Sequence, residues 1–181
     1  MKTLTKLFFG LFFAGIVLTG CQEAKEVLDV KFDADYEAEL DVIVPGTTNF
    51  KAGIDGAFAI NETIDPNTNA EYVQYIDNIR EIDISEVTGE VLSISKNVVL
   101  ETTTISVSNE NYNATWQFTN EPIAVGTTLT LDNSAGQWDA MSSIMMDKKV
   151  FTVSLVGQTD EDDVEFVVLF KLKSEVTANP L

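Results

Sequence analysis

The sequence predicts a mainly β protein, a single antiparallel β-sandwich with two short helices. The first observation is alternation of apolar and polar residues, which is clearest over 151–155 and 165–172. The second is the frequency of turn signals such as Pro45-Gly46, which divide the chain into short strands. The third is that only two segments have helical spacing, too few for the crossovers of a parallel sheet. A closed β-barrel is the alternative that this pattern leaves open.

The expected strands follow the alternation along the chain. They cover residues 27–32, 36–44, 80–94, 102–107, 116–118, 127–131, 151–155 and 166–172. Within the third of them, Thr88-Gly89 predicts a bulge or a turn. The polar stretch 157–163 has the length of a hairpin connection between the last two strands. The last strand is apolar on both faces at its centre, which predicts that both faces are covered.

Two segments replace the period of two with helical spacing. Over 70–79 the spaced residues are Tyr72, Tyr75, Ile76 and Ile79. Over 134–147 they are Trp138, Met141, Ile144 and Met145. Asn69 or Thr68 is the expected N-cap of the first helix, and Ser134 that of the second, because their side chains can accept backbone N–H bonds.

The first twenty residues have the marks of a secretion signal. Lys2 and Lys6 are positive, and residues 7–18 are all apolar or small. A helix that crosses a bilayer needs about 20 such residues, so this segment is short for a membrane span. The residues that follow it, Leu18-Thr19-Gly20-Cys21, resemble the bacterial lipobox, which has an aliphatic residue, two small residues and then cysteine.

The resemblance to bacterial lipoproteins implies that Cys21 carries the anchor. It implies a diacylglycerol thioether on the Cys21 sulfur, cleavage before Cys21 and acylation of the new amine. Residues 1–20 would then be the signal peptide, 21–26 the lipidated N-terminus and tether, and 27–181 a β-rich globular domain. Cys21 is the only cysteine, so the chain has no internal disulfide in an oxidising compartment.

The residues after the lipobox bear on the membrane that is reached. Glu23, Glu26 and Asp29 make the tether acidic, which resembles the surface-export signals of Bacteroidetes lipoproteins, although Ala24-Lys25 interrupts the acidic run. The acidic composition, rich in Asn and Thr, also resembles that group. We therefore expect an exported protein in the outer membrane, on either its periplasmic or its surface face.

Charge and composition exclude several classes of function. The net charge of −18 disfavours binding to nucleic acid and to anionic head groups. Histidine is absent, which removes Ser-His-Asp and Cys-His catalysis and the usual zinc sites. The expectation is a non-enzymatic binding or scaffolding domain, with an envelope protein or a glycan as partner and no cofactor beyond the lipid. The alternatives are a carbohydrate- or calcium-binding module, a carboxylate-dependent glycan hydrolase, and an accessory subunit of a membrane complex.

Two acidic segments are candidates for calcium. Residues 160–163 are four consecutive acids, of which Asp160, Asp162 and Asp163 are the candidate metal ligands. A solvated loop is the simpler interpretation of that run. The segment 65–71 opens like a calcium loop, with D-x-N-x-N, but Ala70 and Ile76 occupy positions where an EF-hand has Gly and Glu. A turn followed by a helix cap explains that segment without an ion.

The aromatic residues suggest one ligand candidate. Trp116, Trp138, Tyr72 and Tyr75 lie at strand or helix spacing, which is typical of core residues. Tyr112 lies in the polar loop 109–113 and is the aromatic residue expected to be exposed, so it is the candidate for stacking on a sugar. No residue is singled out as catalytic.

Overall fold

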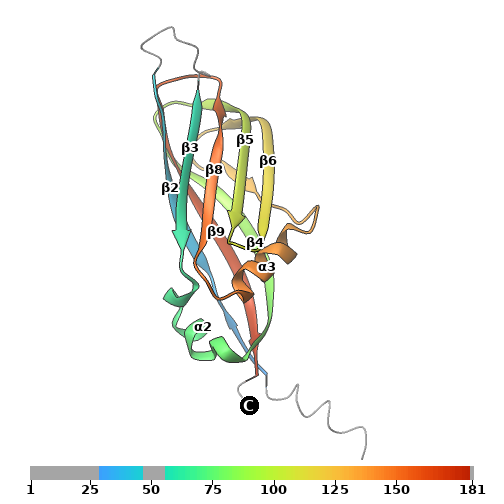
Figure 1. Ribbon diagram of the computed structural model, residues 1–181. Coiled ribbons are helices and arrows are strands. Elements are labelled where there is room, and N and C mark those ends of the chain that lie inside the picture. Colours follow the sequence, from blue (N-terminus) through green and yellow to red (C-terminus); the bar gives the residue numbers. More distant parts are fainter. Residues whose placement is uncertain (1–28, 47–55, 180–181) are drawn as a thin grey trace, which may run out of the picture.

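The computed structural model describes residues 29–46 and 56–179 and shows two antiparallel sheets packed face to face (Figure 1). The first sheet contains β1 (Val30–Asp33), β2 (Tyr36–Val44), β4 (Ile79–Ile94), β7 (Thr128–Thr130) and β9 (Val164–Ala178). The second contains β3 (Ala57–Ile64), β5 (Val98–Ser108), β6 (Asn113–Ile123) and β8 (Phe151–Thr159). The predicted β-sandwich is confirmed, and the closed-barrel alternative is wrong.

The long strand β9 organises the first sheet. It pairs with β4 on one side and with β1 and β2 on the other, and β4 pairs with β7. β1 and β2 are successive stretches of one edge, interrupted at Ala34-Asp35. There the Ser174 hydroxyl donates to the Ala34 carbonyl at 2.6 Å, and the Ser174 N–H donates to Asp35 Oδ1 at 3.2 Å. In the second sheet the order is β3, β8, β5, β6.

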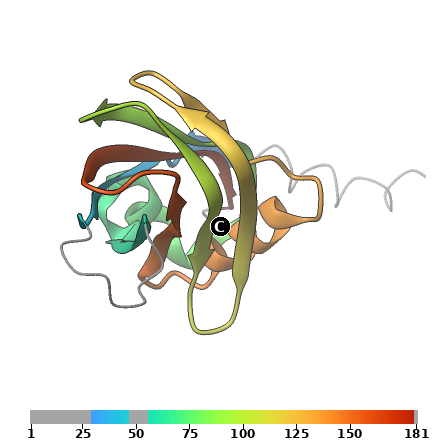
Figure 2. The same cartoon turned by 90° about the horizontal axis from the view of Figure 1, so that it is seen from above.

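The core lies between the sheets, and the alternation of the sequence supplies it. In β9 the buried residues include Phe166, Val168, Phe170 and Leu172, and in β8 they include Phe151, Val153 and Leu155. Phe58 of the second sheet meets Phe166 of the first edge to face, with ring centroids 5.4 Å apart. Removing such side chains from water is the main favourable term in folding. Figure 2 shows the two layers from above.

The first predicted helix is confirmed in a shorter form, α2 (Ala70–Tyr75), flanked by the 3-10 turns η1 (Pro66–Thr68) and η2 (Ile76–Asn78). The Asn69 side chain accepts from the Tyr72 N–H at 2.9 Å, as an N-cap does. Asp65 in turn accepts from the Asn67 N–H. A turn and a cap therefore account for Asp65 and Asn69, the first and last polar positions of the D-x-N-x-N segment. Tyr72 is fully buried, and its hydroxyl donates to the Met145 carbonyl.

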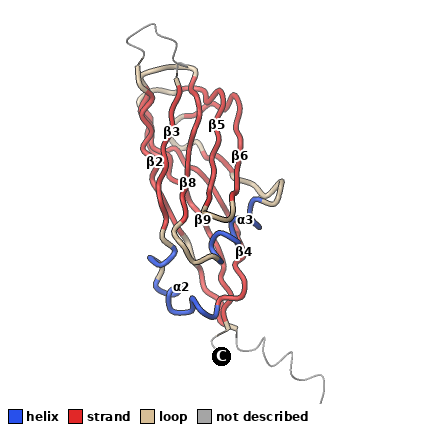
Figure 3. Tube along the Cα trace, in the orientation of Figure 1, coloured by secondary structure: helices blue, strands red, loops and turns tan. Residues whose placement is uncertain are grey.

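The second helix, α3 (Gln137–Met146), buries the predicted stripe of Met141, Ile144 and Met145. Its N-cap is Gly136 at φ 78°, a left-handed conformation that glycine adopts without strain. The prediction of Ser134 as the cap is wrong, because the backbone reverses at Gly136 and the helix begins after it. Asn133 accepts from the Trp138 N–H at 2.9 Å instead. α3 contacts β4 and β6 and so joins the two sheets along one side (Figure 3).

Three local predictions do not hold. Thr88-Gly89 is no turn, since β4 runs through it in regular register with β9 and β7. The stretch 157–163 is no hairpin connection, since β8 and β9 lie in different sheets and Gly157 belongs to β8. The outer face of β9 is only half-buried at Val167 and Leu169. Each of these features depends on which strands become neighbours, and that is a property of the whole fold.

One buried hydroxyl in the core has no hydrogen-bond partner among the described residues: Thr103 Oγ1 on β5. Burying an unpaired polar group costs about 1 to 3 kcal/mol. Thr103→Val keeps the shape and removes the hydroxyl, so we expect it to raise the free energy of unfolding by about 1 kcal/mol. The matched control is Thr159→Val, which removes a buried hydroxyl that donates to the Gly56 carbonyl at 3.2 Å. This control should lower the free energy of unfolding. Urea unfolding measures both, and equal signs would contradict the prediction.

The two ends of the sandwich differ in what they carry. Asp29 and Asn179 lie at the end that α2 covers, joined by a bond of 2.9 Å from Asn179 Nδ2 to Asp29 Oδ1 (Figure 1). The opposite end carries the connections at 45–46, 95–97 and 160–163. Within the described residues, neither helix has the length and apolar character that crossing a membrane requires.

Candidate functional site

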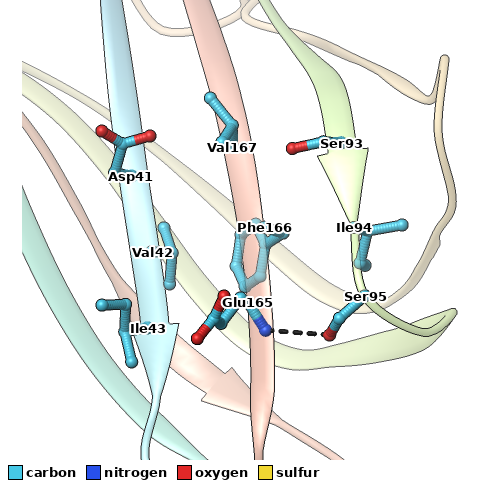
Figure 4. Close-up of a pocket in the computed structure, with 9 residues that line it drawn as sticks. All are labelled: Asp41, Val42, Ile43, Ser93, Ile94, Ser95, Glu165, Phe166 and Val167. Carbon is cyan, nitrogen blue, oxygen red and sulfur yellow. Dashed lines mark hydrogen bonds between the residues drawn. The ribbon is translucent and has the colours of Figure 1, made fainter.

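An open hollow of about 590 Å³ lies on the outer face of the first sheet near the end away from α2 (Figure 4). It is lined by β2, β9 and the end of β4, through residues 41–43, 93–95 and 165–167. Ile43 is opposite Glu165 and Asp41 is opposite Val167 in the pairing of β2 with β9. In each of these two pairs, an apolar side chain therefore lies beside an acidic one.

Exposed apolar and acidic side chains lie together in this outer-face hollow. Ile43 is 69 % exposed, which is high for a large apolar side chain. The Glu165 N–H donates to Ser95 Oγ at 3.0 Å and holds the loop after β4 against β9. Asp41 and Glu165 are both exposed. The two carboxylates therefore face solvent from an open sheet face.

The acidic run 160–163 bonds to neighbouring segments of the chain at the end of the sandwich away from α2. Asp160 Oδ1 accepts from the Val99 N–H at 2.8 Å, and Asp162 Oδ1 accepts from the Gly56 N–H at 3.0 Å. Glu161 forms an ion pair of 2.6 Å with Lys96, and this bond raises the pKa of the Lys96 ammonium. Two of the carboxylates thus hold the backbones of the segments that enter β3 and β5.

That geometry bears on the calcium hypothesis for Asp160, Asp162 and Asp163. Asp160 accepts from Val99 in β5 and Asp162 accepts from Gly56, the residue before β3, and Asp163 follows at φ 53°. Among residues 29–46 and 56–179, no three Asp, Glu, His or Cys side chains are grouped so that they could hold one metal ion. The structure therefore gives Asp160 and Asp162 a structural role that the sequence did not suggest.

Asp160→Ala tests that structural role. The Val99 N–H would lose a charged acceptor, so the free energy of unfolding should fall by about 1 kcal/mol. Asp160→Asn keeps an oxygen at the same place and should cost less than half as much. Thermal unfolding of both variants, with and without added calcium, measures the difference. Equal losses for the two variants would show that the negative charge, and not the hydrogen bond, is what matters.

Tyr112 stands where the sequence predicts, in the loop between β5 and β6, and is 44 % exposed. The loop is ordered by Asn109, whose Oδ1 accepts from the N–H groups of Asn111 and Tyr112, each at 2.9 Å. Tyr112 borders a hollow of about 420 Å³ together with Arg80, Glu81, Ile82, Ser142, Ser143, Met146 and Asp147. This hollow lies at the end that α2 covers, so Tyr112 is not brought together with the acids 160–163.

The other aromatic side chains do not form a platform with Tyr112. Tyr72 and Trp116 are buried, and Trp138 is partly buried. Tyr75 packs on Phe32, with ring centroids 5.6 Å apart. The prediction that these aromatic residues belong to the core is confirmed.

A third hollow, which sequence reasoning missed, opens beside β6. It has a volume of about 550 Å³ and is lined by residues 115–118 of β6 and by Thr130, Asp132, Ser134 and Gln137. The Trp116 indole N–H donates to the Asp132 carbonyl at 2.7 Å, and that of Trp138 donates to the Leu131 carbonyl at 2.9 Å. The two tryptophans therefore fix the segment 131–132 beside the strand. The feature of the sequence that could have pointed to this hollow is the uncharged stretch 113–119.

The lipobox residues Leu18, Thr19, Gly20 and Cys21 lie outside the described residues, as does the tether 21–26. The acylation of Cys21 therefore stays a prediction of the sequence.

Comparisons with known proteins add a likeness in shape only. No family model matches the chain, and no curated protein matches it. Among solved structures, a chain described as Desmodium yellow mottle tymovirus is similar over 84 % of this chain and 90 % of its own length, at 6 % identity and a TM-score of 0.27.

Proposed function

We propose that this chain is a lipid-anchored lipoprotein of the cell envelope, and that its β-sandwich is a non-enzymatic binding or scaffolding domain. The observation that carries the proposal is Leu18-Thr19-Gly20-Cys21, placed directly after a short apolar segment. The acidic tether favours the outer membrane. Several acyl chains on one cysteine anchor a protein stably, whereas a single chain binds reversibly.

The position of Asp29 supports a defined orientation. Asp29 lies eight positions after Cys21, and a fully extended chain of eight residue steps spans at most about 29 Å. The sandwich would therefore stay close to the bilayer. Because Asp29 lies at the end covered by α2, the connections at 45–46, 95–97 and 160–163 would lie farthest from the lipid.

The chemistry of the chain supports binding over catalysis. It contains no histidine, and its single cysteine is committed to the anchor. The acids of the outer-face hollow, Asp41 and Glu165, are exposed on a sheet face. A glycan hydrolase would instead need two facing acids in a groove, about 5 to 10 Å apart.

Cys21→Ser tests the anchor. Serine cannot form the thioether, so the variant should carry no lipid and should move from the membrane fraction to the soluble fraction. Mass spectrometry of the N-terminal peptide and cell fractionation measure these two results. Gly20→Ala is the matched control, since alanine keeps a small residue before the cysteine and should leave acylation intact. Unchanged membrane attachment of Cys21→Ser would refute the lipoprotein proposal.

Protease treatment of intact cells then assigns the face of the membrane. Loss of the acylated domain would place it on the cell surface, where a glycan or a foreign surface is the partner to seek. Protection until the outer membrane is permeabilised would place it in the periplasm and favour a scaffolding role.

A further inference from the structure

The strand β6 presents one free edge. It is the last strand of the second sheet, pairs with β5 through ten residue pairs, and has no strand on its other side within the described residues. Gln137 Nε2 donates to the Thr115 carbonyl at 3.5 Å, which shows that the backbone groups of Thr115 point to the free edge. In an antiparallel strand this direction repeats every second residue, so those of Gln117 and Thr119 point there too.

Proteins usually protect such edges with charges, proline or a bulge. β6 has these devices only at one end, where Asn120 stands at φ 55° and is followed by Glu121 and Pro122. Residues 113–119 contain no charged side chain and no proline, although the chain has 29 acidic residues. The unprotected stretch is thus also the one whose Thr115, Trp116, Gln117 and Phe118 line the 550 Å³ hollow.

The segments that line the hollow limit what can bind there. One wall is β6, and the opposite wall is Thr130 of β7, the short edge strand of the first sheet. Asp132, Ser134 and Gln137, at the start of α3, bound the space beside the strand. The start of α3 therefore borders the free edge of β6 on this side.

Charge argues in the same direction. A second copy of this chain would bring another net charge of −18 to the edge, and like charges repel. A basic segment would instead be attracted to the acidic domain. The lining of the hollow is otherwise made of hydroxyl, amide and aromatic groups, which accommodate a peptide without demanding a particular sequence.

We propose that the free edge of β6 over 115–119 binds an extended basic segment of a partner protein as an added strand of the second sheet. Main-chain hydrogen bonds to Gln117 and Thr119 would hold the segment, and Trp116 and Phe118 would contact its side chains. This inference deepens the proposed binding role and rests on it, but it does not depend on the lipid anchor.

The test uses the acylated full-length protein in detergent micelles. The probe is an octapeptide in which lysine alternates with valine and threonine, and its twin carries N-methyl groups on the amides of one edge. Only two tryptophans are present, and Trp116 lines the hollow, so tryptophan fluorescence reports occupancy. We expect saturable binding of the probe and at least about tenfold weaker binding of the twin, because the methyl groups remove the main-chain donors.

Two variants locate the binding on β6. Gln117→Pro removes an N–H of the free edge and leaves the ladder to β5 intact, so it should weaken probe binding by about tenfold. Gln117→Thr changes the side chain, keeps the N–H and should bind as the wild type does. Circular dichroism checks the fold of both, and the comparison of probe with twin stands even if Gln117→Pro does not fold.

Several outcomes would overturn the proposal. They are absence of saturable binding, equal binding of probe and twin, and equal binding by folded Gln117→Pro. Sedimentation velocity supplies one more, since a dimer that dissociates in Gln117→Pro would assign the edge to a second copy. None of these outcomes affects the fractionation of Cys21→Ser, so failure of the edge site and failure of the anchor are distinguishable.

Discussion

Gly157→Ala is expected to unfold the sandwich under conditions in which the wild type is stable. Gly157 lies in β8, opposite Thr103 of β5. A Cβ added there would lie 2.5 Å from the Thr102 carbonyl oxygen, 2.6 Å from Thr103 Oγ1 and 2.8 Å from Phe58 Cζ. The carbonyl belongs to the backbone of β5 and cannot turn aside, and Phe58 packs against Phe166. Relief would therefore require β5 and β8 to separate.

Overpacking of a core costs about 1 to 3 kcal/mol and occasionally more. Because a backbone atom is one of those in conflict, we expect Gly157→Ala to lower the free energy of unfolding by at least about 3 kcal/mol. Gly126→Ala is the control: that glycine has φ 84° but no atom within 4 Å of an added Cβ. It should cost about 1 kcal/mol of backbone strain. Equal losses in urea unfolding would contradict this account.

Alkaline pH is expected to destabilise the protein through two buried tyrosines. Burial raises the pKa of Tyr72 from 10.0 to about 12, and it raises the pKa of Tyr36 further. Both hydroxyls donate to backbone carbonyls, that of Tyr36 to Pro66 at 3.1 Å and that of Tyr72 to Met145. Ionisation would end both hydrogen bonds and place a negative charge in the core.

The sign of the effect follows from proton binding. Above pH 10 the unfolded chain loses the tyrosine protons, whereas the folded protein keeps them until its own higher pKa. Stability is therefore constant below about pH 10 and is lost as pH rises toward 12 and beyond. One pKa unit corresponds to about 1.4 kcal/mol, so Tyr72 alone contributes a loss on the order of 3 kcal/mol.

Tyr72→Phe separates this effect from others. At pH 7 the variant should lose about 1 kcal/mol with the hydrogen bond to Met145, but its stability should fall less steeply above pH 10. Lys171 and Lys173 have raised pKa values through their bonds to Glu90 and Glu86. Their deprotonation also lowers the free energy of unfolding in this pH range. Because Tyr36 and those lysine pairs remain in the variant, a slope unchanged by Tyr72→Phe would contradict the assignment of the alkaline loss to Tyr72. Chemical unfolding at several pH values measures it.

The strands could be predicted well, because the burial of a sandwich strand alternates with the period of its side chains. Thr103, Ile105 and Val107, which share one face of β5 by alternation, are all buried. Gly89 shows the limit of this reasoning. Without a side chain it looks like a break, yet an added Cβ would lie 3.2 Å from Val168 Cγ1, so a side chain of the neighbouring strand β9 fills its place. A glycine that makes room for a neighbour and a glycine that turns the chain look the same in one sequence.

The candidate sites could be predicted less well. Tyr112 was found because it lies in a polar loop outside any regular pattern. The roles of Asp160 and Asp162 were missed, because their partners Val99 and Gly56 lie 61 and 106 residues away in the chain. The hollow beside β6 was missed for a related reason. Whether a strand lies at an edge depends on the order of strands in its sheet, and alternation alone carries no information about that order.

The sequence by itself therefore determined the periodic features: where apolar side chains alternate, that a helix begins after a cap at Thr68 or Asn69, and that histidine is absent from any active site. Only the tertiary structure decided that β8 and β9 belong to opposite sheets, that two acids hold distant backbones and that β6 ends its sheet. The physical reason is the separation in sequence of the residues that interact. Side-chain periodicity and helix caps act between residues a few positions apart, whereas strand order is set by packing between segments separated by most of the chain.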